Sequence, residues 1–137
     1  MPFDLTIVTP QGQAYQGPVD RVVLPGSEGD FGVLPAHERF LAPLRIGAVE
    51  IRAGSETLWA AIADGFAEVN GEAVTVLVES CELAHEIDAA QAEHSRERAE
   101  QRLAALDWDE DGERYARYEA ALELARVRLE VIGKTSH

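Results

Sequence analysis

Residues 84–92 read AHEIDAAQA, and here the chain changes from a strand-like to a helix-like pattern. Before Ile87, apolar and polar residues alternate between turns that contain glycine and proline, which is typical of short, half-buried strands. After Ile87, apolar residues recur at helical spacing. Asp88, followed three residues later by Gln91, is a variant of the capping box and predicts the start of a helix. The sequence therefore divides at 1–86 and 87–137.

The two parts also differ in charge. Residues 1–86 hold 13 acidic and 4 basic side chains, whereas residues 87–137 hold 12 acidic and 8 basic ones. The formal net charge is −13, and Lys134 is the one lysine. Binding to nucleic acid or anionic lipid needs clustered Lys and Arg, so this composition excludes both. Because no apolar run approaches about 20 residues, we expect no direct membrane insertion. The sequence places the chain in the cytosol, or at a membrane only through a partner.

The N-terminal part predicts an antiparallel β-sandwich. Asn70-Gly71 lies between two apolar runs and indicates a two-residue hairpin turn, because Asn and Gly tolerate the positive φ angles that such a turn needs. Strands this close together, with no helix between them, favour two packed antiparallel sheets. The expected strands are 3–8, 19–24, 48–52, 57–63, 65–69 and 73–78.

The C-terminal part predicts a two-helix antiparallel hairpin. The first helix is expected to reach about residue 106, and the second to start from an aspartate in 107–111 and to end at Gly133. The apolar seam of the second helix comprises Tyr115, Tyr118, Leu122, Ala125, Leu129 and Ile132. The facing seam comprises Ala89, Ala92, Arg96, Ala99, Leu103 and Leu106. Since alanine buries little area at roughly 25 cal/mol per Å², the contact is expected to be weak. The hairpin could dock, open or extend, or it could be permanently packed.

No pattern predicts catalysis, a metal or a cofactor. Cys81 is the single cysteine, so no internal disulfide can form. Residues 27–32 lack the Lys and Ser/Thr of a phosphate-binding loop and are interpreted as a turn. Asp107, Asp109 and Asp111 begin like a calcium loop but lack its later glutamate, so helix capping is the better interpretation. The four histidines have no metal-ligand spacing. The sequence therefore predicts a protein that is not an enzyme.

One stretch carries a family resemblance. Residues 28–37 read EGDFGVLPAH, residues 65–70 read GFAEVN ahead of the apolar run 73–77, and residues 86–88 open the helices. In this order the stretches resemble the epsilon subunit of the F-type ATP synthase, and the resemblance covers the whole chain. Ala36 stands where the family usually has glycine, and residues 38–40 replace a common Ala-Pro-Leu.

The resemblance implies a non-catalytic central-stalk, or rotor, subunit. In the family, the sandwich binds the gamma subunit and rests on the ring of c subunits, so that c-ring rotation is coupled to ATP synthesis. Asp30 and His37 correspond to positions that face the c-ring, on exposed loops at one end of the sandwich. The implied location is the cytoplasmic face of the bacterial inner membrane, as a peripheral part of the complex.

The resemblance also implies a regulatory hairpin. The family's hairpin either lies compactly against the sandwich or extends into the catalytic alpha and beta subunits, where it blocks ATP hydrolysis. Basic side chains of the second helix carry part of that contact. The corresponding residues here are Arg114, Arg117, Arg126, Arg128 and Lys134.

Some members of the family bind ATP at the compact hairpin through an Ile-Asp-x-x-Arg/Lys-Ala pattern. Gln91 and Leu124 stand where that pattern has cations, so we expect weak ATP binding or none. The alternative function, from a different class, is a stand-alone nucleotide-sensing module with the same architecture. The residues that match the ATP pattern are Glu82, Ile87, Asp88, Ala92 and Arg128.

Overall fold

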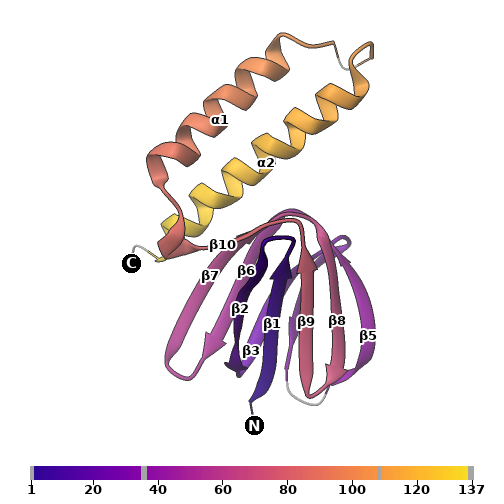
Figure 1. Ribbon diagram of the computed structural model, residues 1–137, viewed down its shortest axis with the longest axis vertical. Helices are drawn as coiled ribbons and strands as arrows, with labels where there is room; N and C mark the ends of the chain where they lie inside the picture. The colour runs from indigo at the N-terminus through magenta and orange to yellow at the C-terminus, as the bar shows by residue number, and fades with distance from the viewer. Residues whose placement is uncertain (1, 35–36, 108, 136–137) are drawn as a thin grey trace.

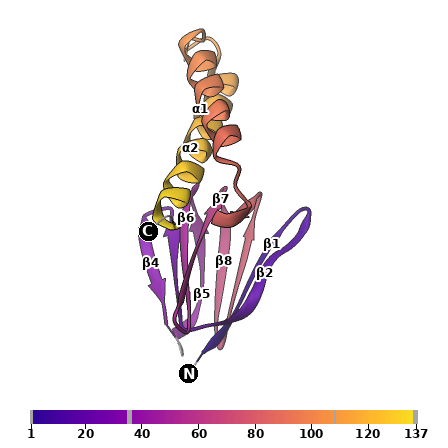
Figure 2. The same ribbon diagram turned by 90° about the vertical axis from the view of Figure 1, so that its left-hand side faces the viewer.

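A computed structural model describes residues 2–34, 37–107 and 109–135 of the chain. A β-sandwich is followed by two antiparallel helices, as predicted (Figure 1). The helical hairpin stands at one end of the sandwich, and the N-terminus lies at the other (Figure 2).

Ten strands form one continuous sheet in the described part of the chain, in the order β10-β7-β6-β3-β5-β8-β9-β1-β2, with β4 on β3. Strands β3 and β5 join only through Gly26 and Leu44, and the two halves of the sheet pack face to face around a shared core. The bounds are β1 Phe3–Thr9, β2 Gly12–Val19, β3 Arg21–Gly26, β4 Gly29–Val33, β5 His37–Leu44, β6 Gly47–Ala53, β7 Glu56–Ile62, β8 Gly65–Gly71, β9 Ala73–Val78 and β10 Cys81–Leu83.

One strand pair departs from the predicted antiparallel arrangement. Strands β1 and β9 run parallel, with Leu5 opposite Val74 and Ile7 opposite Val76. A parallel pair needs a long crossover connection, and strands β2 to β8 supply it here. As the period-two pattern of β1 predicts, Leu5 and Ile7 are fully buried in the core.

Four strands were not predicted from the sequence, namely β2, β4, β5 and β10. The run that was interpreted as a single strand over 19–24 is broken at Asp20, whose carboxylate accepts a hydrogen bond from the Gly54 backbone at 2.7 Å. Its own backbone N–H donates to the Arg52 carbonyl at 2.7 Å. The prediction that 27–32 is a turn is also wrong: the turn is confined to 27–28, and β4 begins at Gly29, where φ is +134°.

The hairpin between β8 and β9 forms one residue later than predicted. Asn70 pairs with Ala73, which leaves Gly71 and Glu72 as the two loop residues. Gly71 has a φ of +53° and supplies the positive angle that such a turn needs. The sequence therefore identified the hairpin but not its central residues.

The helical part comprises a 3₁₀ turn, η1 Ala84–Glu86, and two helices, α1 Ala89–Ala104 and α2 Gly112–Thr135. Asp88 caps α1 as predicted, since its carboxylate accepts from the Gln91 backbone N–H at 3.1 Å. The Gln91 side-chain amide donates to the Ser95 hydroxyl at 3.1 Å rather than back to Asp88. No described helix is both long and apolar enough to cross a membrane.

The expected end of the second helix is wrong. Gly133 lies inside α2, which continues to Thr135. The Lys134 ammonium lies 5.1 Å from the centroid of the Trp59 ring on β7, and this cation–π contact holds the last turn against the sandwich. A tertiary contact therefore outweighs the helix-ending tendency of glycine.

Candidate functional site

The helical hairpin contacts the sandwich through α2, which lies against β6 and β7. Val127 and Val131 are buried against Ala61 of β7 and form a small core separate from that of the sandwich. Five partly buried residues surround it: Ile46, Ala48, Trp59, Ala84 and Ile87. We call these eight residues the docking cluster.

The docking cluster was missed because α2 is apolar on two faces. The predicted seam of α2 packs on α1, with Leu122 and Ala125 buried. On the facing seam, Ala89 at the start of α1 is exposed. The second face is formed by Leu124, Val127 and Val131, at spacings of three and four residues, so its signal was present in the sequence. The seam residues therefore do not compete for the sandwich, because different residues make the two contacts.

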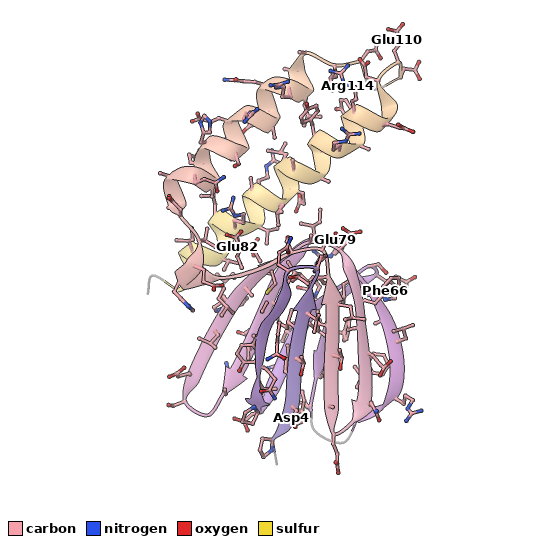
Figure 3. All side chains as sticks on the ribbon, in the orientation of Figure 1. Asp4, Phe66, Glu79, Glu82, Glu110 and Arg114 are labelled. Atoms are coloured by element: carbon pink, nitrogen blue, oxygen red, sulfur yellow. The ribbon has the colours of Figure 1, made fainter. Side chains whose placement is uncertain are left out.

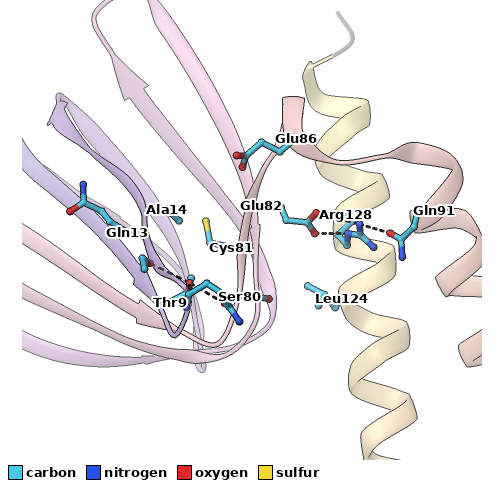
Figure 4. Close-up of a pocket in the computed structure, with 12 residues that line it drawn as sticks. Thr9, Gln13, Ala14, Ser80, Cys81, Glu82, Glu86, Gln91, Leu124 and Arg128 are labelled. Carbon is cyan, nitrogen blue, oxygen red and sulfur yellow. Dashed lines mark hydrogen bonds and ion pairs between the residues drawn. The ribbon is translucent and has the colours of Figure 1, made fainter.

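A pocket of about 560 Å³ lies beside the docking cluster, between the sandwich and the hairpin (Figure 4). Arg128 of α2 lines the hairpin side of this pocket. One of its guanidinium nitrogens, Nη2, donates to the Gln91 Oε1 at 2.6 Å and to the Glu82 Oε2 at 3.3 Å. The Nε atom lies 2.7 Å from the Glu82 Oε1, but its N–H is not aligned for a hydrogen bond, so that contact is an ion pair. Arg128 thereby connects α2 to both β10 and α1.

The structure brings together only part of the set that resembles an ATP site. Glu82 and Arg128 line the pocket, with Gln91 and Leu124 at the two positions where cations were expected. The other three residues do not line it and have local roles: Ile87 packs in the docking cluster, Asp88 caps α1, and Ala92 is buried in the hairpin seam.

Cys81 lines the same pocket and packs partly against the sandwich core. Burial raises the pKa of its thiol to about 12, and the carboxylates of Glu86 and Glu82 add to the rise.

We expect the alkylation of Cys81 to be slow at neutral pH. Each unit by which the thiol pKa rises lowers the thiolate fraction about tenfold, so the reaction with iodoacetamide at pH 8 should be roughly a hundredfold or more slower than for the unfolded chain. The rate should continue to rise above pH 9, where an ordinary thiol levels off. A plateau near pH 9 in a pH series of labelling rates would contradict the buried, acid-flanked environment.

The two residues expected at the c-ring do not lie together. Asp30 is in strand β4, opposite Pro25, and its carboxylate forms an ion pair with Arg45. His37 begins β5 and pairs with Gly71, at the opposite end of that strand from Arg45. Since β5 has eight residues, the two positions are roughly 20 Å apart. Both lie in strands rather than loops, which corrects the expectation of one shared loop surface. The His37 side chain lies outside the described residues.

The basic residues of α2 divide into two groups. Arg114, Arg117 and Arg126 are exposed, and Arg114 lies 3.8 Å from Asp111 near the tip of the hairpin (Figure 3). Arg128, by contrast, is 12% exposed and is paired with Glu82, so it does not belong to an open basic face in this conformation. Lys134 is exposed, and its ammonium lies over the Trp59 ring.

An exposed apolar row crosses the outer face of β5, β8, β9 and β1, in the half of the sandwich that does not contact the hairpin through β6 and β7. Pro43 of β5 pairs with Phe66 of β8, Phe66 with Leu77 of β9, and Leu77 with Val8 of β1. Directly paired residues point to the same side of a sheet, so these four side chains form one row, and Phe66 projects away from the hairpin (Figure 3). Phe66 and Leu77 are each 53% exposed. Exposed apolar patches of this kind mark interaction surfaces.

Two family models match the chain in succession. The model described as "ATP synthase, Delta/Epsilon chain, beta-sandwich domain" matches residues 2–84. The model described as "ATP synthase, Delta/Epsilon chain, long alpha-helix domain" matches residues 85–133. The chain belongs to the ATP synthase delta/epsilon chain family. Both the resemblance drawn from its sequence and the predicted fold class are thereby confirmed.

Individual relatives agree with this family assignment. The ATP synthase epsilon chain of Syntrophobacter fumaroxidans is 45% identical over 131 residues, which are 96% of each chain. That of Halalkalibacterium halodurans is 39% identical over 130 residues, which are 95% of this chain and 96% of the relative. A chain in a structure of the Euglena gracilis mitochondrial ATP synthase, comprising OSCP, F1 and c-ring, matches with a TM-score of 0.78 and 25% identity over 99% of this chain and 82% of that one.

Proposed function

We propose that this chain is a non-catalytic rotor subunit of a proton-translocating F-type ATP synthase. In this role it couples c-ring rotation to ATP synthesis through its sandwich, residues 1–86. It regulates ATP hydrolysis through its hairpin, residues 87–137. Its place would be the cytoplasmic face of the bacterial inner membrane, where it is peripheral. Membership of the delta/epsilon family and the likeness to a chain in the OSCP, F1 and c-ring structure of a mitochondrial ATP synthase support this proposal.

The exposed apolar row is the observation that carries the proposal. Pro43, Phe66, Leu77 and Val8 lie on the half of the sandwich that the hairpin leaves uncovered, and Leu41, 67% exposed, extends the same face. An apolar surface next to charged ones is expected to be covered by a protein partner. We assign this face to the gamma subunit, whose contact must persist through rotation and therefore favours apolar burial.

For the c-ring we propose a contact at Asp30, which lines a pocket with Trp59 and Lys134 at the end of the sandwich that carries the docked hairpin, so this contact would have to lie beside the hairpin. Glu28 and Asp30 are exposed beside the β3–β4 turn, where acidic side chains can meet polar loops. The separation along β5 means that His37 could share this contact only if the partner surface ran the length of the strand.

The hairpin is proposed to meet the catalytic alpha and beta subunits when it leaves the sandwich. Arg114, Arg117 and Arg126 are already exposed and would provide the basic face of the extended form. Arg128 would join them only after undocking, which would also release the exposed Lys134 from the Trp59 ring. Opposite charge on the partner would favour specific docking more than raw affinity.

Copurification from native membranes tests the proposal against its alternative. A tagged copy of the chain should bring down gamma and the c-ring in stoichiometric amounts. Recovery of the chain alone with a stoichiometric bound nucleotide would favour the stand-alone sensing module instead.

We further propose that the residues resembling an ATP site do not bind ATP at physiological levels. Arg128 is already paired with Glu82 and Gln91, and the positions of Gln91 and Leu124 supply no cation to the pocket. Because hydrogen bonds to charged groups each contribute about 1.5 to 3 kcal/mol, the affinity should be at least a hundredfold below that of a site with both cations.

Calorimetry with the isolated chain and millimolar ATP should therefore detect little heat. The double variant Gln91→Arg with Leu124→Arg should gain measurable affinity, since it restores both charges at the pocket. Micromolar binding by the natural chain would show that its own arginines suffice.

A further inference from the structure

Three elements meet at the Arg128 side chain. Arg128 belongs to α2, Glu82 to β10 in the sandwich, and Gln91 to the first turn of α1 (Figure 4). The contact with Gln91 closes the hairpin, and the contact with Glu82 joins the hairpin to the sandwich. One guanidinium group therefore couples the two arrangements, which in principle could change separately.

Because the Arg128 guanidinium is largely buried, its contacts stabilise the docked hairpin more than exposed ion pairs would. The Arg128 side chain is 12% exposed, unlike Arg126 two residues earlier, which is exposed. Exposed ion pairs contribute little because water screens them, whereas a sheltered and hydrogen-bonded pair is screened less. Arg128 keeps these partners only while the hairpin is closed and docked.

We propose that the docked hairpin of this chain is held by an internal clamp, Glu82–Arg128–Gln91, and needs no bound nucleotide. This inference deepens the proposed regulatory role of the hairpin and rests on it for its physiological meaning. The clamp acts beside the docking cluster and the Lys134–Trp59 contact, so breaking it shifts the equilibrium between docked and undocked forms without abolishing docking. In this chain, the side chain at position 91 occupies a guanidinium that could otherwise bind an anion.

Cys81 provides a native reporter for the clamp in the isolated full-length chain. It is the only cysteine and it lines the pocket that the hairpin partly closes, so its alkylation rate should rise with the undocked population. The informative variant is Arg128→Leu, and Arg126→Leu is the matched control, because it removes the same charge from the exposed side of the same helix. Gln91→Ala removes only the contact with α1.

We expect Arg128→Leu to alkylate with iodoacetamide about tenfold faster than the natural chain, Gln91→Ala several-fold faster, and Arg126→Leu at an unchanged rate. Burial and the carboxylates of Glu86 and Glu82 raise the pKa of the Cys81 thiol. Removing the Arg128 positive charge without undocking would leave the Glu82 carboxylate unneutralised, so this change alone would slow the alkylation. An acceleration therefore reports undocking. Millimolar ATP should leave the natural rate unchanged.

Equal rates for the Arg128 and Arg126 variants would overturn the clamp, and slowing of the natural chain by ATP would overturn its independence of nucleotide. Iodide quenching of Trp59 fluorescence, in a Trp108→Phe background, gives a second readout with the same expected order. If Arg128→Leu fails to fold, Gln91→Ala still decides, because Gln91 is exposed. Since every arm uses the isolated chain, failure of the rotor assignment would leave these results unaffected.

Discussion

Replacing Phe66 and Leu77 by aspartate is expected to remove the chain from its complex while leaving its fold intact. Both side chains are about half exposed, so the isolated sandwich should tolerate the change. In an interface that covers the apolar row, each unpaired charge would cost about 3 kcal/mol or more, which corresponds to more than a hundredfold in affinity for each substitution. The measurement is recovery of the tagged double variant with gamma from native membranes.

A matched control adds the same charge elsewhere. Ser55→Asp with Thr57→Asp changes exposed positions at the β6–β7 end of the other layer, far from the apolar row. This pair should assemble normally. Normal assembly of the Phe66 and Leu77 variant, with unchanged thermal unfolding, would show that the row is not the gamma-binding surface.

The second large effect is expected from deleting residues 87–137. A chain ending at Glu86 keeps all ten described strands and the sandwich core, so it should unfold cooperatively and still join the complex. ATP hydrolysis by the resulting complex should rise by several-fold to about tenfold, because the equilibrium of a regulatory hairpin rests on a difference of a few kcal/mol. Steady-state hydrolysis over a range of ATP and ADP concentrations measures it.

The truncated chain also separates regulation from assembly. A complex that contains it but hydrolyses ATP at the natural rate under every nucleotide condition would remove the regulatory role. A truncated chain that no longer joins gamma would show that the hairpin helps to build the complex. The tip variant Arg114→Ala, in the full-length chain, should have a smaller effect in the same direction.

The sequence predicted the elements whose signal is local. The change of pattern near Ile87 and the cap at Asp88 correspond to a 3₁₀ turn and to the start of α1. The alternation of Leu5 and Ile7 corresponds to buried positions. A helix cap depends on hydrogen bonds within one segment, and alternating burial depends on one buried face of a strand. The residue pattern of that single segment is enough to predict both.

Features that depend on distant partners were missed or displaced. Strand β2 contains glycines and a proline, and its pairing with β1, rather than its own pattern, makes it a strand. Ala61 looks like an ordinary outward position until α2 covers it. Asp30 and His37 are seven residues apart in sequence, yet β4 carries the chain from the end near Arg45, where Asp30 lies, toward the opposite end, where His37 begins β5. The sequence alone does not contain those pairings.

The central claim is that the outer face of β8 and β9 binds the gamma subunit. A photo-crosslinking amino acid placed at Phe66 tests it most directly, with a second one at Thr57 for comparison. After illumination of native membranes, the chain labelled at Phe66 should give one major adduct, and mass spectrometry should identify its partner as gamma. The probe at Thr57 should not give that adduct. Absence of a gamma adduct from Phe66 in an assembled complex, or equal gamma adducts from both positions, would contradict the account.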